Sequence, residues 1–180
     1  MTHNTNIVDR VRGRADTVLV PMNQVGIALR SPTRPYGYLA TEGLNGCTGV
    51  AIISSTAGIL AHVAPLPPGS TSTTQLASGR QNLVAKIQGM INLYNTHKSH
   101  FPQGRSCIVA AVYQNAVAVP DAIRTITAVL DRLGLPIKII YYNVLNSGVA
   151  RIPGQTSVVI DATADGWPKM FVNNQEIQYH

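Results

Sequence analysis

The sequence predicts an α/β domain, a layered β-sandwich of mixed sheets flanked by two helices. Two segments, residues 79–96 and 120–133, repeat apolar residues at intervals of three and four, as amphipathic helices do. Short apolar runs rich in Val and Ile precede, separate and follow these segments, and such runs are typical of buried strands. The resulting order of strands, helix, strand, helix and strands is that of a mixed α/β layered domain.

Each strand is expected from a short apolar run bounded by turn-forming residues. Only residues 54–58 separate two of these runs, which predicts a hairpin. Asp165 and Gly166 predict a hairpin turn between the last two strands. Residues 65–78 predict a long loop of the kind that often acts as a lid or binding loop. The expected strands are residues 17–20, 24–29, 36–40, 50–53, 59–63, 106–113, 137–143, 157–162 and 170–172.

Length and composition indicate a single globular domain. The chain has 180 residues, of which 45% are hydrophobic and 12% charged. We expect a flexible N-terminal arm over residues 1–15 and one domain over residues 16–180. The net charge of +6 gives a weak indication of an acidic partner. The clustered cations Arg10, Arg12 and Arg14 have no aromatic residues between them, so they favour a solvated tail and no nucleic-acid binding.

The sequence also carries expectations about location and redox state. No apolar run approaches the ~20 residues of a membrane span, so we expect none. The N-terminal residues lack the apolar stretch of a secretory signal, which favours a cytoplasmic protein, although secretion as an effector stays open. Cys47 and Cys107 are the two cysteines and make no disulfide framework, and a single bridge stays open.

Cys47 is the first candidate for chemistry, because it lies among glycines in residues 43–49, Gly-Leu-Asn-Gly-Cys-Thr-Gly. A thiol acts as a nucleophile only as the thiolate, and a nearby imidazole lowers its pKa. Glycines leave backbone N–H groups open, and such groups can bind a tetrahedral oxyanion. The commoner role of a lone cysteine is a small buried residue at a strand start.

His62 is the second candidate, since it is a polar residue inside an apolar strand. A histidine satisfied by hydrogen bonds in the core is the usual interpretation. The fifteen residues from Cys47 to His62 span one short turn, so the two lie on neighbouring strands. A turn centred near residues 54–55 places them directly opposite each other, and one centred near Thr56 offsets them by about three residues.

The pattern around both residues resembles a known family. Residues 41–50 are Thr-Glu-Gly-Leu-Asn-Gly-Cys-Thr-Gly-Val, and residues 58–62 are Gly-Ile-Leu-Ala-His. They are similar to the active-site segment of the chemotaxis glutamine deamidase CheD, which has a Thr six residues before the Cys and an Ala-His after a hairpin. The cytotoxic necrotizing factor toxins share that Cys–His arrangement, and eukaryotic N-terminal asparagine amidohydrolases look like more distant relatives. The order of elements looks CheD-like from about residue 36 to 175.

The resemblance implies a cysteine-dependent amidohydrolase that needs no cofactor and no metal. Cys47 would be the nucleophile, His62 the base, and Thr41 the active-site threonine that binds the substrate amide or the imidazole. Backbone N–H groups at Cys47 and Gly46 would hold the oxyanion, with Asn45 beside them. Asn45 and Gly46 stand where the family has Gly-Ser. The implied reaction converts a protein Gln or Asn side chain to the acid through a thioester, and the net positive charge suggests that the partner is acidic.

Other interpretations stay open. The substrate could be a small or N-terminal amide, an amine in place of water would give transglutamination, and a non-catalytic binding module could keep the fold. A low pKa of Cys47 would favour the enzyme, whereas a pKa near the free value of ~8.5 would favour the binding module.

A redox protein ranks last because no Cys-x-x-Cys pair is present. Cys107 is expected in the core, and His97 and His100 lack a third ligand, so both are expected at a helix end or in solvent.

Overall fold

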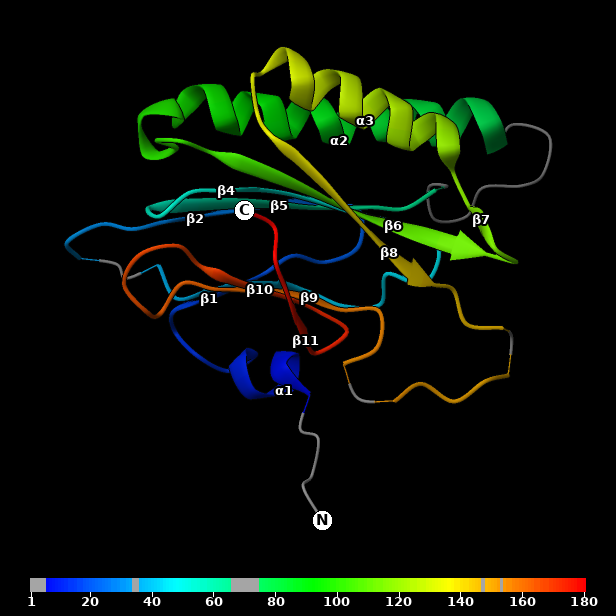
Figure 1. Cartoon of the computed structure of the whole chain (residues 1–180), viewed down its shortest axis with the longest axis horizontal. Coiled ribbons are helices and arrows are strands. Elements are labelled where there is room, and N and C mark those ends of the chain that lie inside the picture. The colour runs from blue at the N-terminus through cyan, green and yellow to red at the C-terminus, as the bar shows by residue number, and fades with distance from the viewer. Residues whose placement is uncertain (1–5, 34–35, 66–74, 147, 153) are drawn as a thin grey trace.

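The computed structural model describes residues 6–33, 36–65, 75–146, 148–152 and 154–180, and it has four layers (Figure 1). Helices α2 (Gln75–Thr96) and α3 (Pro120–Arg132) form the first layer. Two β-sheets follow, called sheet I and sheet II here, and the short helix α1 (Ile7–Val11) covers the far side of sheet II. The predicted α/β class with layered mixed sheets and two main helices is therefore confirmed at this level.

Both sheets mix parallel and antiparallel pairs. In sheet I only β6 and β8 are parallel, and in sheet II only β1 and β3. The strand order in sheet I is β2 (Val25–Leu29), β5 (Ala57–Val63), β4 (Thr48–Ile53), β6 (Arg105–Tyr113) and β7 (Ala116–Val117), with β8 (Ile137–Asn143) also beside β6. The order in sheet II is β1 (Thr17–Leu19), β3 (Tyr38–Thr41), β9 (Val158–Asp161), β10 (Lys169–Val172) and β11 (Gln175–Ile177).

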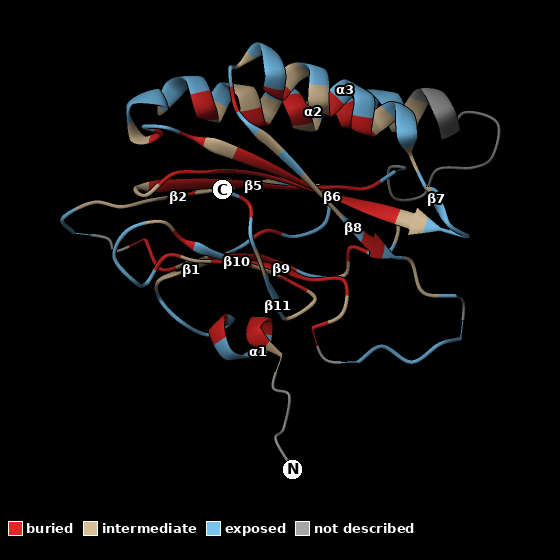
Figure 2. Cartoon of the chain, viewed as in Figure 1, coloured by how far each residue is buried: buried red, intermediate tan, exposed pale blue. Residues whose placement is uncertain are grey.

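Two apolar cores lie on opposite faces of sheet I, which is why its central strands are buried along their whole length (Figure 2). The helix-side core joins the sheet to α2 and α3 through residues such as Ile52, Ile59, Met90 and Ile126. The inter-sheet core joins sheet I to sheet II through Leu39, Ala51, Leu60, Val109 and Ile160, among others, and it contains Cys47.

Residues 6–15 correct the prediction of a flexible arm. Asn6 caps α1 by accepting a hydrogen bond from the Val8 amide at 3.1 Å. The buried side chains of Ile7, Val8 and Val11 pack against sheet II. A helix of five residues gives too short a period to detect in the sequence, and its stability comes from this packing. Residues 1–5 lie outside the described part of the chain.

Several boundaries also differ from prediction, and turn geometry explains them. Residues 114–115 and 173–174 have φ between 50° and 63°, which suits the tight turns that create the short strands β7 and β11. Asp165 and Gly166 instead lie within a longer loop between β9 and β10. Helix α2 begins at Gln75, so part of the expected loop 65–78 is helical, and residues 66–74 are outside the described residues.

The turn between β4 and β5 fixes the register of the hairpin that carries the candidate site. Ile53 pairs with Gly58, which leaves four residues in the connection. The Ser54 hydroxyl donates to the carbonyl of His100 at 2.6 Å, and the Thr56 hydroxyl donates to the same oxygen at 2.7 Å. His100 is the last residue of the 3₁₀ helix η1 (Lys98–His100), which lies between α2 and β6. The register is therefore set by tertiary contacts as well as by the turn.

No helix in the described part of the chain is long and apolar enough to cross a membrane.

The spacing of the two sheets gives a testable stability prediction. A Cβ added at Gly58 would lie 2.0 Å from the Tyr36 hydroxyl oxygen, and Tyr36 is only 2% exposed. We expect Gly58→Ala to lower the free energy of unfolding by about 2 kcal/mol or more, because overpacking forces the sheets apart. Urea unfolding measures the effect. Gly13→Ala is the control, since nothing lies within 4 Å of its added Cβ; equal stability of the two variants would contradict the packing.

Candidate active site

Register places Cys47 and His62 on the same face of sheet I. Gly49 pairs directly with His62 across β4 and β5, and directly opposed residues share a face. Cys47 lies two residues before Gly49 and so points to that face as well, toward sheet II. The offset of two residues falls between the two registers considered from the sequence. Cβ atoms of such diagonal neighbours lie roughly 7–8 Å apart or less, within reach of an imidazole and a thiol.

Thr41 fixes the orientation and the tautomer of the His62 ring. Its hydroxyl oxygen lies 2.7 Å from His62 Nδ1 and also 2.7 Å from the carbonyl oxygen of Val20. A carbonyl only accepts, so the single hydroxyl hydrogen is donated to Val20. The hydroxyl oxygen must then accept a hydrogen from Nδ1. His62 is therefore protonated on Nδ1, and its Nε2 carries a free lone pair.

The packing of the two sheets creates this contact. His62 lies on β5 of sheet I, whereas Thr41 ends β3 of sheet II. Val20 follows β1, and its amide donates to the carbonyl of Ala40 at 2.8 Å. The His62 backbone is held at the other side, because its amide donates to the carbonyl of Gln24 at 3.0 Å. Of the two roles expected for Thr41, the structure displays the hydrogen bond to the imidazole.

Burial makes His62 a weak base, and its ring is neutral at neutral pH. The side chain is 1% exposed, and Nε2 has no hydrogen-bond partner among the described residues. Burial lowers the pKa of His62 to about 4, because the charged imidazolium would lose its hydration. A buried polar atom without a partner is uncommon and often marks a functional site. At neutral pH the ring offers an unprotonated nitrogen to whatever enters the site.

Cys47 is a buried, protonated thiol in this structure. Its side chain is free of any disulfide and 4% exposed, and burial raises its pKa to about 11. The shift is opposite to the low pKa of a preformed thiolate, since burial is its only cause and no cation compensates it. His62 Nε2 accepts no hydrogen bond from this thiol. At rest, the site therefore has a neutral thiol and a neutral imidazole on the same sheet face, with no hydrogen bond between them.

A tight turn delivers Cys47 to the start of β4. The Cys47 amide donates to the carbonyl of Leu44 at 2.5 Å, which closes a four-residue β-turn. Gly46 has φ of +93° at the third position of this turn, where a positive φ is required for type II geometry. Leu44 is fully buried and is tied to the segment that precedes β9, because its amide donates to the carbonyl of Thr156 at 2.9 Å.

Tyr142 of β8 holds this turn from the other side and was not predicted from the sequence. Its hydroxyl oxygen lies within hydrogen-bond distance of the carbonyls of Leu44 and Cys47, the latter at 2.7 Å, and the single hydroxyl hydrogen is shared between these two acceptors. The same oxygen accepts from the Gly46 amide at 3.0 Å. Burial, and then the neighbouring Cys47, raises the pKa of Tyr142. One buried position in a strand gives no sequence signal for such a role, because the contact joins residues almost a hundred positions apart.

The predicted oxyanion groups are engaged inside the protein. The Gly46 amide donates to Tyr142, and the Cys47 amide donates to Leu44. The Asn45 side-chain oxygen accepts from the Leu145 amide at 3.1 Å, so Asn45 ties the turn to the end of β8. The oxyanion role of Gly46 and Asn45 stays a prediction, and it requires these bonds to be exchanged when a substrate binds.

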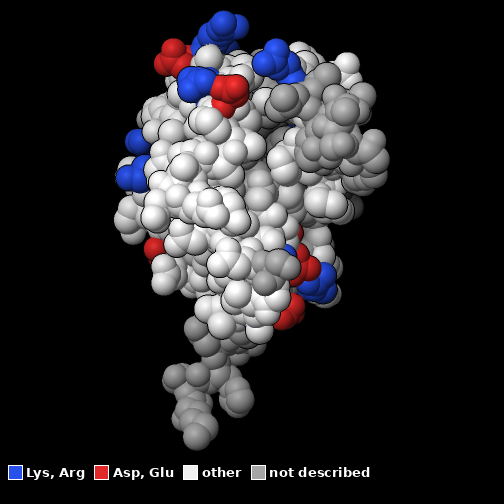
Figure 3. Space-filling view, turned by 90° about the vertical axis from the view of Figure 1, so that its right-hand side faces the viewer, with Lys and Arg blue, Asp and Glu red and all other residues white. Residues whose placement is uncertain are grey.

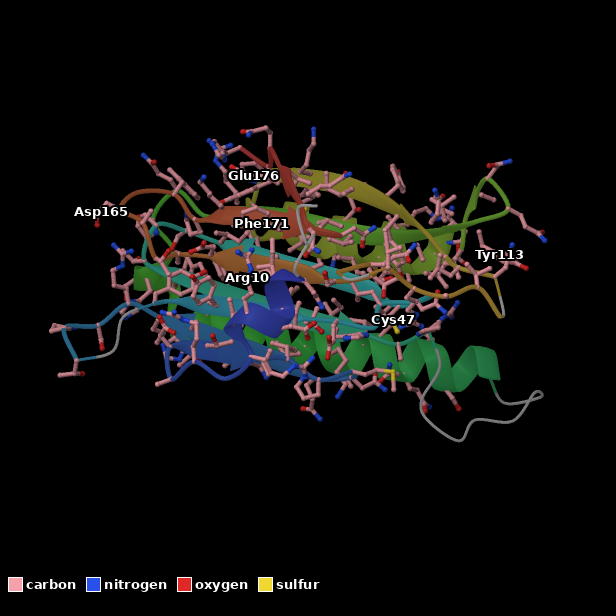
Figure 4. All side chains as sticks on the ribbon, turned by 90° about the horizontal axis from the view of Figure 1, so that it is seen from below. Arg10, Cys47, Tyr113, Asp165, Phe171 and Glu176 are labelled. Carbon is pink, nitrogen blue, oxygen red and sulfur yellow. The ribbon has the colours of Figure 1, made fainter. Side chains whose placement is uncertain are left out.

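An apolar groove of about 540 Å³ opens beside the turn. It begins at Gly46, directly before Cys47, and at Pro65, just after the strand that carries His62. Figure 4 shows Cys47 and Tyr113 toward the same end of the molecule. The remaining lining comes from the β6–β7 hairpin and the residue after β8, namely Tyr113, Val117, Ala118, Val119 and Val144.

The surface at this end carries few charges. Figure 3 views it directly and shows a broad uncharged face, with Lys, Arg, Asp and Glu grouped toward its margins. Two of the arginines expected in a solvated tail are used in ion pairs instead. Arg12 bonds Glu42, and Arg14 bonds Asp16 at 2.9 Å. The net positive charge of the chain is thus not concentrated at the candidate site.

The other sequence candidates lie elsewhere. Cys107 is on β6, fully buried, and burial raises its pKa to about 12, which agrees with the expected core role. His97 directly precedes η1 and His100 is its last residue, and the carbonyl of His100 accepts hydrogen bonds from the β4–β5 turn. Within the residues that the structure describes, no three His, Cys, Asp or Glu side chains form a metal-binding group.

Comparisons with known proteins add no assignment: no family model matches the chain, and no curated protein matches it. The CheD resemblance therefore rests on the motif alone.

The buried His62 predicts acid instability. Its pKa is about 4 in the folded state and about 6.5 when unfolded, so the unfolded chain takes up the proton first. Stability should fall as the pH drops from 6.5 to 4, by at most about 3 kcal/mol, and this group should have no effect above that window. Urea unfolding across pH tests this. His62→Asn, which cannot titrate, should lose less stability over the window; identical slopes would contradict the burial of a neutral ring.

The Tyr142 contacts predict a local effect on the turn. Tyr142→Phe removes the hydroxyl that bonds three backbone groups, so the Gly46 amide should exchange with solvent hydrogen at least about tenfold faster. Hydrogen exchange by NMR measures this rate. Tyr141→Phe is the matched control, because Tyr141 neighbours Tyr142 in the sequence but is 56% exposed. An unchanged Gly46 rate in Tyr142→Phe would show that the phenol does not hold the turn.

Proposed function

We propose that the protein is a cysteine-dependent amidohydrolase that converts a Gln or Asn side-chain amide of another protein to the acid. One observation carries this proposal. A buried His62 nitrogen with a free lone pair lies on the same sheet face as a free thiol, and a hydroxyl from the second sheet fixes its tautomer. This arrangement supplies a nucleophile, a base and a group that orients the base, which are the parts of covalent acyl transfer.

The reaction follows from these groups. The Cys47 thiol gives its proton to His62 Nε2 as its sulfur attacks the carboxamide carbon. The tetrahedral intermediate collapses with cleavage of the C–N bond, and the imidazolium returns the proton to the departing nitrogen, so ammonia leaves and a thioester remains. Water then attacks the thioester and gives a proton to Nε2. The thiolate leaves, regains that proton, and the acid is released.

The resting geometry implies that substrate binding completes the site. A neutral thiol with a pKa of about 11 and an imidazole with a pKa of about 4 do not form an ion pair unaided. The Gly46 amide must also leave Tyr142 before it can bind an oxyanion. Catalytic hydrogen bonds are often long in apo enzymes and tighten in the substrate complex. Proton transfer therefore occurs together with sulfur attack in this proposal, not before it.

The fold supports the same proposal more broadly. Two packed mixed sheets covered by two helices, with the thiol at the start of one hairpin strand and the imidazole on the next, suit the CheD-like arrangement that the motif implies. Thr41 occupies the motif's threonine position, and its hydrogen bond to His62 gives that threonine a physical role. We include a CheD-like fold in the proposal on these grounds.

A non-catalytic binding module is the second candidate, and one observation favours it. Cys47 is nearly inaccessible, and its raised pKa is typical of inert buried cysteines. In that case the apolar groove would bind a partner and the thiol would serve as core packing. Substitution of Cys47 by Ser would then leave the interaction unchanged.

Ammonia release and a mass increase of candidate substrate proteins test the enzyme directly. We expect activity in the wild type and a loss of at least about 1,000-fold in Cys47→Ala and His62→Ala, because both groups act in the same step. Cys107→Ala is the control for loss of a thiol outside the site and should keep its activity per folded molecule. Equal activity of all four proteins would refute the mechanism and leave the binding module.

A further inference from the structure

The groove beside Cys47 has an unusual chemical uniformity. Among the residues that the structure describes, every lining side chain is uncharged, and the Tyr113 hydroxyl is the one polar side-chain group. The groove joins the two ends of the candidate hairpin, since Gly46 precedes the thiol and Pro65 closely follows the imidazole strand. Cys47 and His62 are not themselves among its described lining residues, so the groove approaches the pair through Gly46. A substrate that reached Cys47 along this path would place its neighbouring atoms against Val, Ala and Pro side chains.

Charged groups near the site are either paired or act elsewhere. Glu42 follows Thr41 but bonds Arg12, which also lies 3.7 Å from Asp9. Arg151 is exposed to solvent, and its charge partly offsets the raised pKa of the Tyr142 phenol. In the described part of the chain, no charged side chain lines the groove, so the groove itself offers no counter-charge to a charged substrate.

This electrostatic character discriminates between classes of amide. A free amino acid carries an ammonium and a carboxylate a few bonds from its amide, and an N-terminal residue carries the ammonium. Removing such charges from water without partners costs several kcal/mol each. An internal residue of a polypeptide has neutral peptide groups in their place. Apolar neighbours on that polypeptide would gain about 25 cal/mol for each Å² buried against the groove.

We propose that the substrate is an internal carboxamide side chain within an uncharged, apolar stretch of polypeptide, and that free amino acids, N-terminal amides and acidic segments are poor substrates. This inference rests on the proposed amidohydrolase function and specifies its substrate. The net charge of the chain suggested an acidic partner, whereas the uncharged groove favours an uncharged one. The acid product places a new negative charge in a site without a cation, which favours its release.

Capped peptides test the substrate class. One peptide carries a single Gln between Ala, Val and Leu residues, and matched peptides carry Asp or Lys at the flanking positions. We expect kcat/KM for the apolar peptide to exceed that for the charged peptides, for free glutamine and for an uncapped peptide with N-terminal Asn by at least about 100-fold. Values within about threefold of one another would overturn this inference and leave the hydrolase intact. No ammonia release from any substrate would overturn both.

Thiol labelling tests the groove without catalysis. Cys47 modification by neutral benzyl, cationic trimethylammonium-ethyl and anionic sulfonatoethyl methanethiosulfonates is followed by peptide mapping and scaled to rates with free cysteine. We expect the neutral reagent to react at least about tenfold faster than either ion. Ala118→Asp, in the groove, should raise the ratio of cationic to anionic labelling, and Ala116→Asp, outside its lining on the same hairpin, should not. Equal scaled rates for all three reagents would overturn the inference alone.

Discussion

The hydroxyl of Thr41 has one hydrogen, and that hydrogen is donated to the carbonyl oxygen of Val20. The hydroxyl oxygen must then accept from His62 Nδ1, which leaves Nε2 unprotonated and without a partner among the residues that the structure describes. Val20 and Thr41 belong to the sheet II side of the sandwich and His62 to sheet I, so the tautomer depends on the packing of the two sheets. The position of one hydrogen on the His62 ring thus decides whether Nε2 can accept a proton, and the packing of the two sheets sets that position.

Burial determines the protonation states of Cys47 and His62 in this site. The same loss of solvent lowers the pKa of His62 and raises that of Cys47, so the pair stays neutral instead of forming a thiolate and an imidazolium. A neutral site suits a neutral carboxamide, and the uncharged groove extends this match to the surroundings of the amide. Tyr142 holds the turn before Cys47 by bonding its amide and carbonyl groups, and the proposed reaction would require these bonds to be exchanged.

The sequence predicts local features of this fold well and contacts between distant segments poorly. The two helices and the longer strands follow from periodicity, and the placement of Cys47 and His62 on the two sides of one hairpin follows from a short turn. The two-residue offset does not, because the carbonyl of His100 anchors that turn from a distant segment. Helix α1 is too short for a detectable period, and Tyr142 is the one buried position of the otherwise partly exposed strand β8. The motif identifies Thr41, whereas its role requires the carbonyl of Val20, which any residue could supply.

Long-range ¹H–¹⁵N NMR of the His62 imidazole at neutral pH tests the central claim most directly, because it reports which ring nitrogen carries the hydrogen. The structure predicts a protonated Nδ1 and an unprotonated Nε2 in the wild type and in Thr41→Ser, which keeps the hydroxyl, and a loss of this preference in Thr41→Val. A hydrogen on Nε2 in the wild type would mean that His62 offers no base to Cys47, and the proposed chemistry would have no starting point.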